Sequence, residues 1–161
     1  MIKVLFVCHG NICRSIMAEY ICRMMIEERG LEQRVQAESA ATSTEELGNP
    51  IYPPARRTLA AHGVPMGDHR SRQIRREDYR RYDRIIGMDR WNMQNMLRVF
   101  GGDPEGKLQL LSAYGSWEGD VADPWYSGDF ELTYRQVTEG CRGLLDALTK
   151  ELAGNRGKGK E

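Results

Sequence analysis

The apolar and polar positions along the chain change their spacing in a regular way. Helical spacing of three and four residues predicts helices that begin near Ser15, Pro53, Arg75, Asp89 and Asp129, the last of them ending near Ala153. Between these helices, short apolar runs predict four strands at residues 2–7, 34–39, 82–88 and 108–111. Because strands alternate with helices, we expect a doubly wound α/β domain with a parallel sheet.

The first strand leads directly into a loop with unusual chemistry. Residues 2–7 form a nearly continuous apolar run, which is typical of a strand buried on both faces. Residues 8–14 then connect this strand to the helix that begins at Ser15. Such a loop emerges at the carboxyl end of a strand, where open α/β sheets bind ligands and where helix N-termini bind anions.

The residue types in this loop predict a phosphate site that contains a nucleophile. Gly10 and Asn11 tolerate positive φ, so that consecutive amides can turn toward an oxyanion. Arg14 adds a planar set of donors suited to phosphate, and positive surroundings favour the nucleophilic thiolate form of Cys8. Taken alone, a cysteine at the end of an apolar strand is more often a buried core residue. The whole string favours a phosphatase.

A second group of candidate residues lies in a predicted long loop over residues 112–128. Asp123 is the best candidate for the acid that protonates a leaving phenolate. Pro124 holds Asp123 in an extended conformation, and Trp125 and Tyr126 offer flat walls for a phenyl ring. The alternative is an ordinary Asp-Pro turn next to aromatic core residues.

The string Val7-Cys8-His9-Gly10-Asn11-Ile12-Cys13-Arg14-Ser15 resembles the signature of the low-molecular-weight protein tyrosine phosphatases, and the resemblance extends over residues 2–152. It implies a four-stranded parallel sheet in the order 2-1-3-4 with helices on both faces. It also implies hydrolysis of phosphotyrosine and aryl phosphate monoesters through a phosphocysteine, with Cys8, Arg14 and Asp123 as catalytic residues. The residues implied to bind the substrate are His9, Gly10, Asn11, Ile12, Cys13, Ser15, Glu45, Trp125 and Tyr126.

Several residues near this loop have more than one interpretation. Ser15 either donates to the Cys8 sulfur or caps the first helix, and both roles are compatible. Cys13 is either a small loop residue or the partner in a reversible disulfide that protects Cys8 from overoxidation. The resemblance implies that Asn11, Ser39 and His69 form a hydrogen-bond network that holds the loop.

The sequence departs from the family pattern at four places, none of which removes a catalytic group. His9 replaces a common aliphatic residue, Ile16 replaces a proline, and Ala40-Ala41 stands where a glycine is usual. Glu45 replaces an apolar or aromatic wall of the pocket, and we expect its carboxylate to disfavour acidic peptides.

Length and charge narrow the picture further. The 161 residues suit one domain over residues 1–153, followed by a flexible tail over residues 154–161. The 23 basic and 23 acidic side chains cancel, so neither nucleic acid nor an anionic membrane is an expected partner. Without a leader, a membrane-length apolar run or a metal-ligand spacing, we expect a cytoplasmic protein with no metal and no cofactor.

Three rival functions have recognisable sequence requirements. An arsenate reductase of this fold needs two further cysteines after the third strand, and residues 80–100 contain none. A non-catalytic phosphate-binding module would lack the nucleophile or the acid, and a phosphocysteine carrier would not need Asp123. The family resemblance implies phosphotyrosine proteins as partners, a tyrosine kinase among them, and inorganic phosphate or a similar oxyanion in the site.

Overall fold

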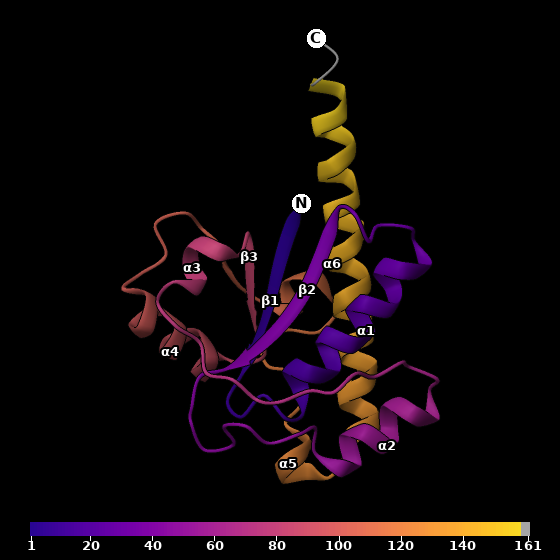
Figure 1. Cartoon of the computed structure of the whole chain (residues 1–161), viewed down its shortest axis with the longest axis vertical. Coiled ribbons are helices and arrows are strands. Elements are labelled where there is room, and N and C mark those ends of the chain that lie inside the picture. The colour runs from indigo at the N-terminus through magenta and orange to yellow at the C-terminus, as the bar shows by residue number, and fades with distance from the viewer. Residues whose placement is uncertain (159–161) are drawn as a thin grey trace.

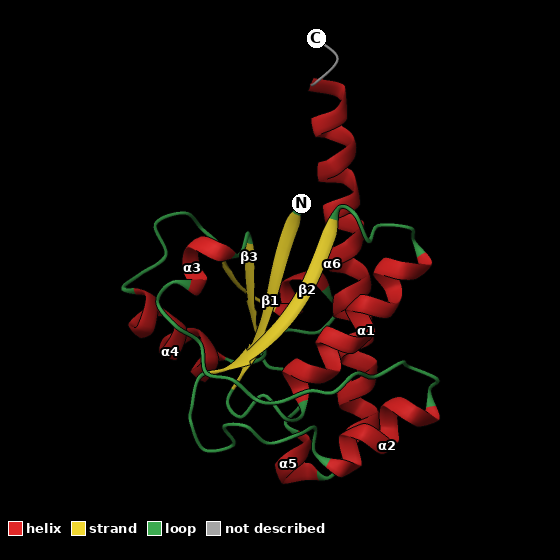
Figure 2. Ribbon diagram, viewed as in Figure 1, coloured by secondary structure: helices red, strands yellow, loops and turns green. Residues whose placement is uncertain are grey.

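The computed structural model describes residues 1–158 and contains one four-stranded parallel sheet in the order β2-β1-β3-β4 (Figure 2). The strands are β1 (Ile2–Cys8), β2 (Val35–Ala41), β3 (Arg84–Gly87) and β4 (Leu108–Leu110). The predicted fold class and strand order are confirmed. The second strand extends two residues further toward its carboxyl end than predicted.

The sheet separates two groups of helices (Figure 1). On one side lie α1 (Arg14–Glu28), α2 (Pro53–Ala61) and the long α6 (Phe130–Lys158). On the other side lie α3 (Asp78–Arg81) and α4 (Arg90–Phe100). The sheet is therefore the middle layer of three.

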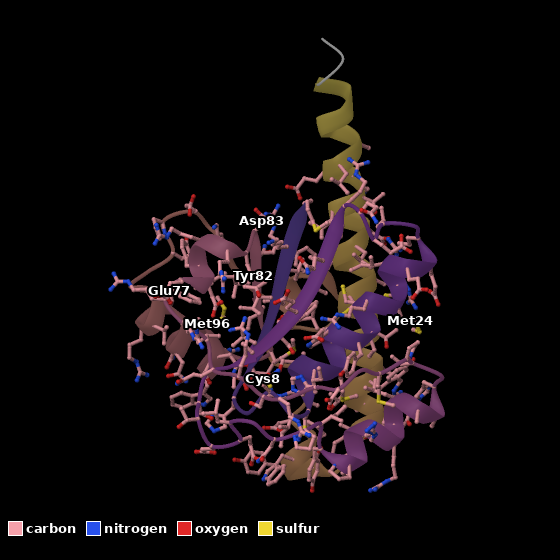
Figure 3. All side chains as sticks on the ribbon, in the orientation of Figure 1. Cys8, Met24, Glu77, Tyr82, Asp83 and Met96 are labelled. Carbon is pink, nitrogen blue, oxygen red and sulfur yellow. The ribbon has the colours of Figure 1, made fainter. Side chains whose placement is uncertain are left out.

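The central strand β1 determines where Cys8 lies. Val4 and Phe6 pack in the core on the α1 and α6 side, whereas Leu5 and Val7 pack with Met96 on the α4 side. Because side chains alternate along a strand, Cys8 shares the face of Val4 and Phe6. Figure 3 shows Cys8 at the lower end of the sheet, where the carboxyl ends of the parallel strands lie.

The two helices that follow β1 and β3 begin in different ways. The Asp89 carboxylate accepts a hydrogen bond from the Asn92 N–H at 2.8 Å and forms a capping box at the start of α4. Cys13 precedes α1 and makes no side-chain cap. The predicted capping role of Ser15 is wrong, because Ser15 lies inside α1 and its hydroxyl contacts other groups.

The region before the last helix is more ordered than predicted. A 3₁₀ turn, η1 (Leu111–Tyr114), and a one-turn helix, α5 (Pro124–Ser127), interrupt the predicted loop. Pro124 suits the first position of a helix, where its missing N–H costs nothing.

The last helix is also longer than predicted. It continues to Lys158, so residues 154–158 of the expected tail are helical, and residues 159–161 lie outside the described residues. One glycine costs a helix only about 1 kcal/mol, so Gly154 does not end it. No helix among residues 1–158 is both long and apolar enough to cross a membrane.

Candidate active site

The loop between β1 and α1 curls around the Cys8 sulfur. The Asn11 N–H donates to Cys8 Sγ at 3.2 Å, and Ser15 Oγ lies 3.0 Å from the same sulfur. Asn11 makes this turn possible, because it adopts a left-handed φ of 60°. Two polar groups thus converge on the sulfur of Cys8, a residue that is only 3% exposed.

Gly10 does not use the conformational freedom that we predicted for it. Positive φ occurs at Asn11, and Gly10 is not among the glycines with positive φ in residues 1–158. A Cβ at Gly10 would lie 3.3 Å from Glu46 Cγ, so close packing is a better reason for glycine here. Of the two loop residues expected to tolerate positive φ, Asn11 adopts it and Gly10 does not.

A cavity of about 350 Å³ opens above this loop. Cys8 and the loop residues through Arg14 line its floor, and Glu45, Asp123, Trp125 and Tyr126 line its walls. All of the predicted catalytic and substrate-binding residues border the cavity except Ser15, which lies behind the sulfur. Ser39 and His69 lie outside it, as expected for residues that support the loop.

Arg14 is held rigidly at the edge of the cavity. Its side chain is 4% exposed, and Nη1 donates to the Val121 carbonyl at 3.2 Å. Nη2 lies 2.9 Å from Asp89 Oδ2 and 3.5 Å from Asp123 Oδ2. Burial opposes the charge of Arg14, but the negative charges of Cys8, Asp89 and Asp123 outweigh it and raise the pKa of the guanidinium.

Asp123 faces the cavity from the start of α5. Its Oδ1 accepts a hydrogen bond from the Trp125 N–H at 3.1 Å, which caps the short helix. Its Oδ2 lies on the side of Arg14, and its side chain is about one-third exposed. The carboxyl group is thus oriented by its own helix and remains open to the cavity.

A hydrogen-bond network supports the loop from behind. Asn11 Nδ2 donates to Ser15 Oγ at 2.8 Å and to Ser39 Oγ at 2.9 Å. His69 Nε2 donates to the Asn11 carbonyl at 2.6 Å. Burial lowers the pKa of His69 despite this hydrogen bond, so the ring is neutral near pH 7. The structure thus brings together the three residues expected to form the network.

The network orients the Ser15 hydroxyl. Because the Asn11 amide donates to Ser15 Oγ, the Ser15 proton is free to point at the sulfur. This geometry allows Ser15 to donate to a Cys8 thiolate.

Some residues of the site were missed by the sequence analysis. Asp89 holds Arg14, Glu19 accepts from Ser39 at 2.8 Å, and Trp91 borders the cavity with 72% exposure. Asp89 had a usable signal, since it follows a buried strand at the same sheet edge as Cys8. Glu19 and Trp91 had none, because each reaches the site only through the packing of its helix.

The rim of the cavity carries a contact between a histidine and a carboxylate. His9 Nε2 lies 2.9 Å from Glu45 Oε2, and both side chains are more than half exposed. The four cysteines are free thiols. Burial, together with the negative charge of Cys8, raises the pKa of Cys13 to about 12. Cys22 and Cys141 are fully buried in the core.

This arrangement of a curled anion loop, a buried arginine and a facing carboxylate at a parallel sheet edge defines a phosphatase. Residues 3–154 match the family described as "Low molecular weight phosphotyrosine protein phosphatase", and the chain belongs to that family. It is a protein tyrosine phosphatase, as the resemblance predicted.

Individual relatives and solved structures are similar to this chain over nearly its whole length. The low molecular weight protein-tyrosine-phosphatase YfkJ of Bacillus subtilis is 37% identical over 153 residues, covering 94% of this chain and 98% of YfkJ. Its crystal structure has a TM-score of 0.90, with coverage of 94% and 96%. A Drosophila protein described as an arginine phosphatase has a TM-score of 0.82 at 30% identity, with coverage of 91% and 98%.

Proposed function

We propose that the chain hydrolyses phosphotyrosine in proteins through a covalent phosphocysteine formed on Cys8. The observation that carries this proposal is the placement of three groups around one cavity. The Cys8 sulfur lies at its floor, the buried Arg14 cation lies at its edge, and the Asp123 carboxyl faces it from the opposite loop. No metal or cofactor enters the proposed mechanism.

The first step transfers the phosphoryl group to sulfur. The Cys8 thiolate forms a bond to phosphorus while the bond from phosphorus to the phenolic oxygen breaks. Asp123 gives its proton to that oxygen, so that tyrosine leaves as a neutral phenol. The loop amides and Arg14 hold the other phosphate oxygens, which fixes the attack in line and stabilises the developing charge.

The second step releases phosphate. Water attacks phosphorus and gives a proton to the Asp123 carboxylate, and the bond from phosphorus to sulfur breaks. Cys8 leaves as a thiolate that accepts hydrogen bonds from the Asn11 N–H and the Ser15 hydroxyl, whose heavy atoms lie 3.2 and 3.0 Å away. These donors make the sulfur a better leaving group. The products are inorganic phosphate and the original enzyme.

The walls of the cavity suit a flat aromatic substrate. Trp125 and Tyr126 stand on one side of the opening, and the apolar Ile12 lies in the floor loop. A phenyl ring can pack between these surfaces while its phosphate reaches the loop. We propose phosphotyrosine proteins of the cytoplasm as substrates, a tyrosine kinase among them.

The Drosophila neighbour suggests phosphoarginine as the competing substrate, and the carboxylates of Glu45 and Glu46 at the mouth would attract a guanidinium. The test compares hydrolysis of phosphotyrosine, phosphoserine and phosphoarginine peptides of one sequence. We expect kcat/KM for phosphotyrosine to exceed the other two by at least about 100-fold, about 3 kcal/mol in the transition state. A preference for phosphoarginine would reject the proposed substrate.

Two variants test the mechanism. Cys8→Ser should bind inorganic phosphate in calorimetry but have no turnover. Asp123→Asn should lose kcat/KM most strongly for esters of weakly acidic phenols, which need a proton on the leaving oxygen. Turnover by Cys8→Ser would contradict the phosphocysteine intermediate.

A further inference from the structure

Tyr52 lies between the two loops of the active site. It directly precedes α2, and its backbone N–H donates to the carbonyl of Ile12 at 2.9 Å. Its ring packs against the Trp125 ring, with centroids 4.9 Å apart and an angle of 47° between the planes. Figure 1 shows α5 beside the start of α2. We call residues 8–14 the phosphate loop and residues 123–129, which include Asp123, the acid loop. Tyr52 therefore contacts the phosphate loop through its backbone and the acid loop through its side chain.

The Trp125 side of this contact leads directly to the proposed acid. The Trp125 N–H donates to Asp123 Oδ1 at 3.1 Å, so the position of Trp125 fixes one carboxylate oxygen. The helix α5 that carries Trp125 is only one turn long, and so short a helix is not stable by itself. Its side-chain contacts therefore decide where it lies.

Few contacts are available to do this, because α5 lies at the surface. Trp125 remains 52% exposed and Tyr126 is 86% exposed, whereas Pro124 is buried. The Tyr52 ring covers part of Trp125 and also lies 6.1 Å from the Phe130 ring at the start of α6. The three rings thus connect the start of α2 to the acid loop at Trp125 and to the start of α6 at Phe130.

Tyr52 itself is held firmly. The residue before a proline is restricted to an extended conformation, and Tyr52, which precedes Pro53, has φ −61° and ψ 131°. Its neighbour Ile51 is buried. A fixed backbone limits the positions open to the ring, so the ring is a rigid support.

We propose that Tyr52 is a positioning residue for the general acid, which it couples to the phosphate loop by packing its ring on Trp125. The inference rests on the proposed role of Asp123. Removing the ring leaves the backbone hydrogen bond to Ile12 in place, so that the phosphate loop keeps its support while the acid loop loses its own.

The test uses kcat/KM, which reports the first chemical step, for two aryl phosphates. In p-nitrophenyl phosphate the leaving group needs little protonation, whereas in phenyl phosphate it needs the acid. The interaction free energy of one aromatic pair corresponds to a change in kcat/KM of about 3- to 10-fold if the whole of it is lost from the transition state. We expect Tyr52→Ala to show this loss for phenyl phosphate and less than about 2-fold for p-nitrophenyl phosphate. Inhibition by inorganic phosphate should be unchanged.

Two further variants separate the ring from general effects. Tyr52→Phe keeps the stacking surface and should match the wild type. Tyr52→Leu keeps apolar volume without an aromatic face and should be intermediate, and it provides the test if Tyr52→Ala does not fold. In the background of Asp123→Asn, Tyr52→Ala should cause no further loss for phenyl phosphate, because the acid through which it acts is absent.

The matched control is Tyr134→Ala. The Tyr134 ring stacks on His62, with centroids 3.7 Å apart and planes at 10°, and this pair joins the end of α2 to α6 without involving Tyr52 or Trp125. We expect the control to lower the unfolding temperature without changing the ratio of the two rates. The inference is overturned if Tyr52→Ala leaves that ratio as Tyr134→Ala does, or if its effect adds to that of Asp123→Asn. Failure of the proposed function would instead appear as an Asp123→Asn variant with no leaving-group dependence.

Discussion

Asp89 Oδ2 lies 2.9 Å from Arg14 Nη2, and the two side chains join the start of α4 to the phosphate loop. Asp89 therefore has two tasks, because the same carboxylate also caps α4. Arg14 needs such a partner, since a buried guanidinium without one would carry a large desolvation cost. The ion pair thus presents the remaining donors of Arg14 to the cavity in one orientation.

We expect Asp89→Asn to lower kcat/KM for phosphotyrosine about 10- to 100-fold, because a small misplacement of a substrate clamp has an effect of this size. Asparagine is as good a helix cap as aspartate, so stability should change much less than activity. Asp89→Ala removes the cap as well and should cost about 1 kcal/mol more in urea unfolding. Equal activity of Asp89→Asn and the wild type would exclude a role in orienting Arg14.

His69 predicts how stability depends on pH. Its pKa is lowered in the folded protein, chiefly by burial, relative to about 6.5 in the unfolded chain. Below pH 6.5 the unfolded chain therefore binds more protons, and the folded state loses stability as the pH falls toward the folded pKa. Above pH 7 both states are neutral at this residue, and the effect is absent.

The measurement is urea unfolding between pH 5 and pH 8. His69→Gln keeps an N–H donor for the Asn11 carbonyl but cannot titrate, so its loss of stability on the acid side should be smaller than that of the wild type. Parallel curves for the two proteins would show that His69 contributes nothing to the pH dependence.

Cys13 provides an internal comparison for the reactivity of Cys8. The pKa of Cys13 is about 12, mainly because of burial, so its thiol is protonated at neutral pH. We expect iodoacetamide at pH 7 to modify Cys8 first, and inorganic phosphate to slow this reaction. Mass spectrometry of peptides identifies the labelled residue, and Cys13→Ser should be inactivated at the wild-type rate. Labelling of Cys13 ahead of Cys8 would contradict the proposed electrostatics of the loop.

The disulfide between Cys8 and Cys13 stays a prediction, and the protonated Cys13 would form it slowly.

The position of Glu45 at the mouth of the cavity predicts a preference against phosphotyrosine peptides with acidic neighbours. Its carboxylate is exposed and paired with His9, so its effect on a neighbouring substrate charge should be modest, about 2- to 5-fold, and weaker in high salt. We expect Glu45→Gln to improve kcat/KM for phosphotyrosine peptides with acidic neighbours. A neutral peptide serves as the control substrate and should be unaffected, and an equal gain for both peptides would rule out charge as the cause.

Most of the fold could be predicted from the sequence, because the residue patterns that indicate its strands and helices are local. Apolar runs located the four strands, and the string around Cys8 located the phosphate loop. The remaining features depend on side-chain contacts that the residue pattern does not reveal. Gly10 needs to be small because of Glu46, which lies 36 positions away. The Ser15 hydroxyl contacts Asn11 and Cys8 within the curled loop and does not cap α1. Asp89 joins the site only because β3 lies beside β1 in the sheet.

The first helix reaches the phosphate loop without a side-chain cap, and this links the ligand to the folding equilibrium. The uncapped N–H groups at its start have no intrahelical acceptors, and we expect a bound oxyanion to supply them. Under the proposed function, the product of the reaction would then also be a structural ligand of the folded enzyme. By mass action, inorganic phosphate at 100 times its dissociation constant would add about 2.7 kcal/mol to the free energy of unfolding. The cell's phosphate pool would thus both protect the enzyme and restrain its turnover.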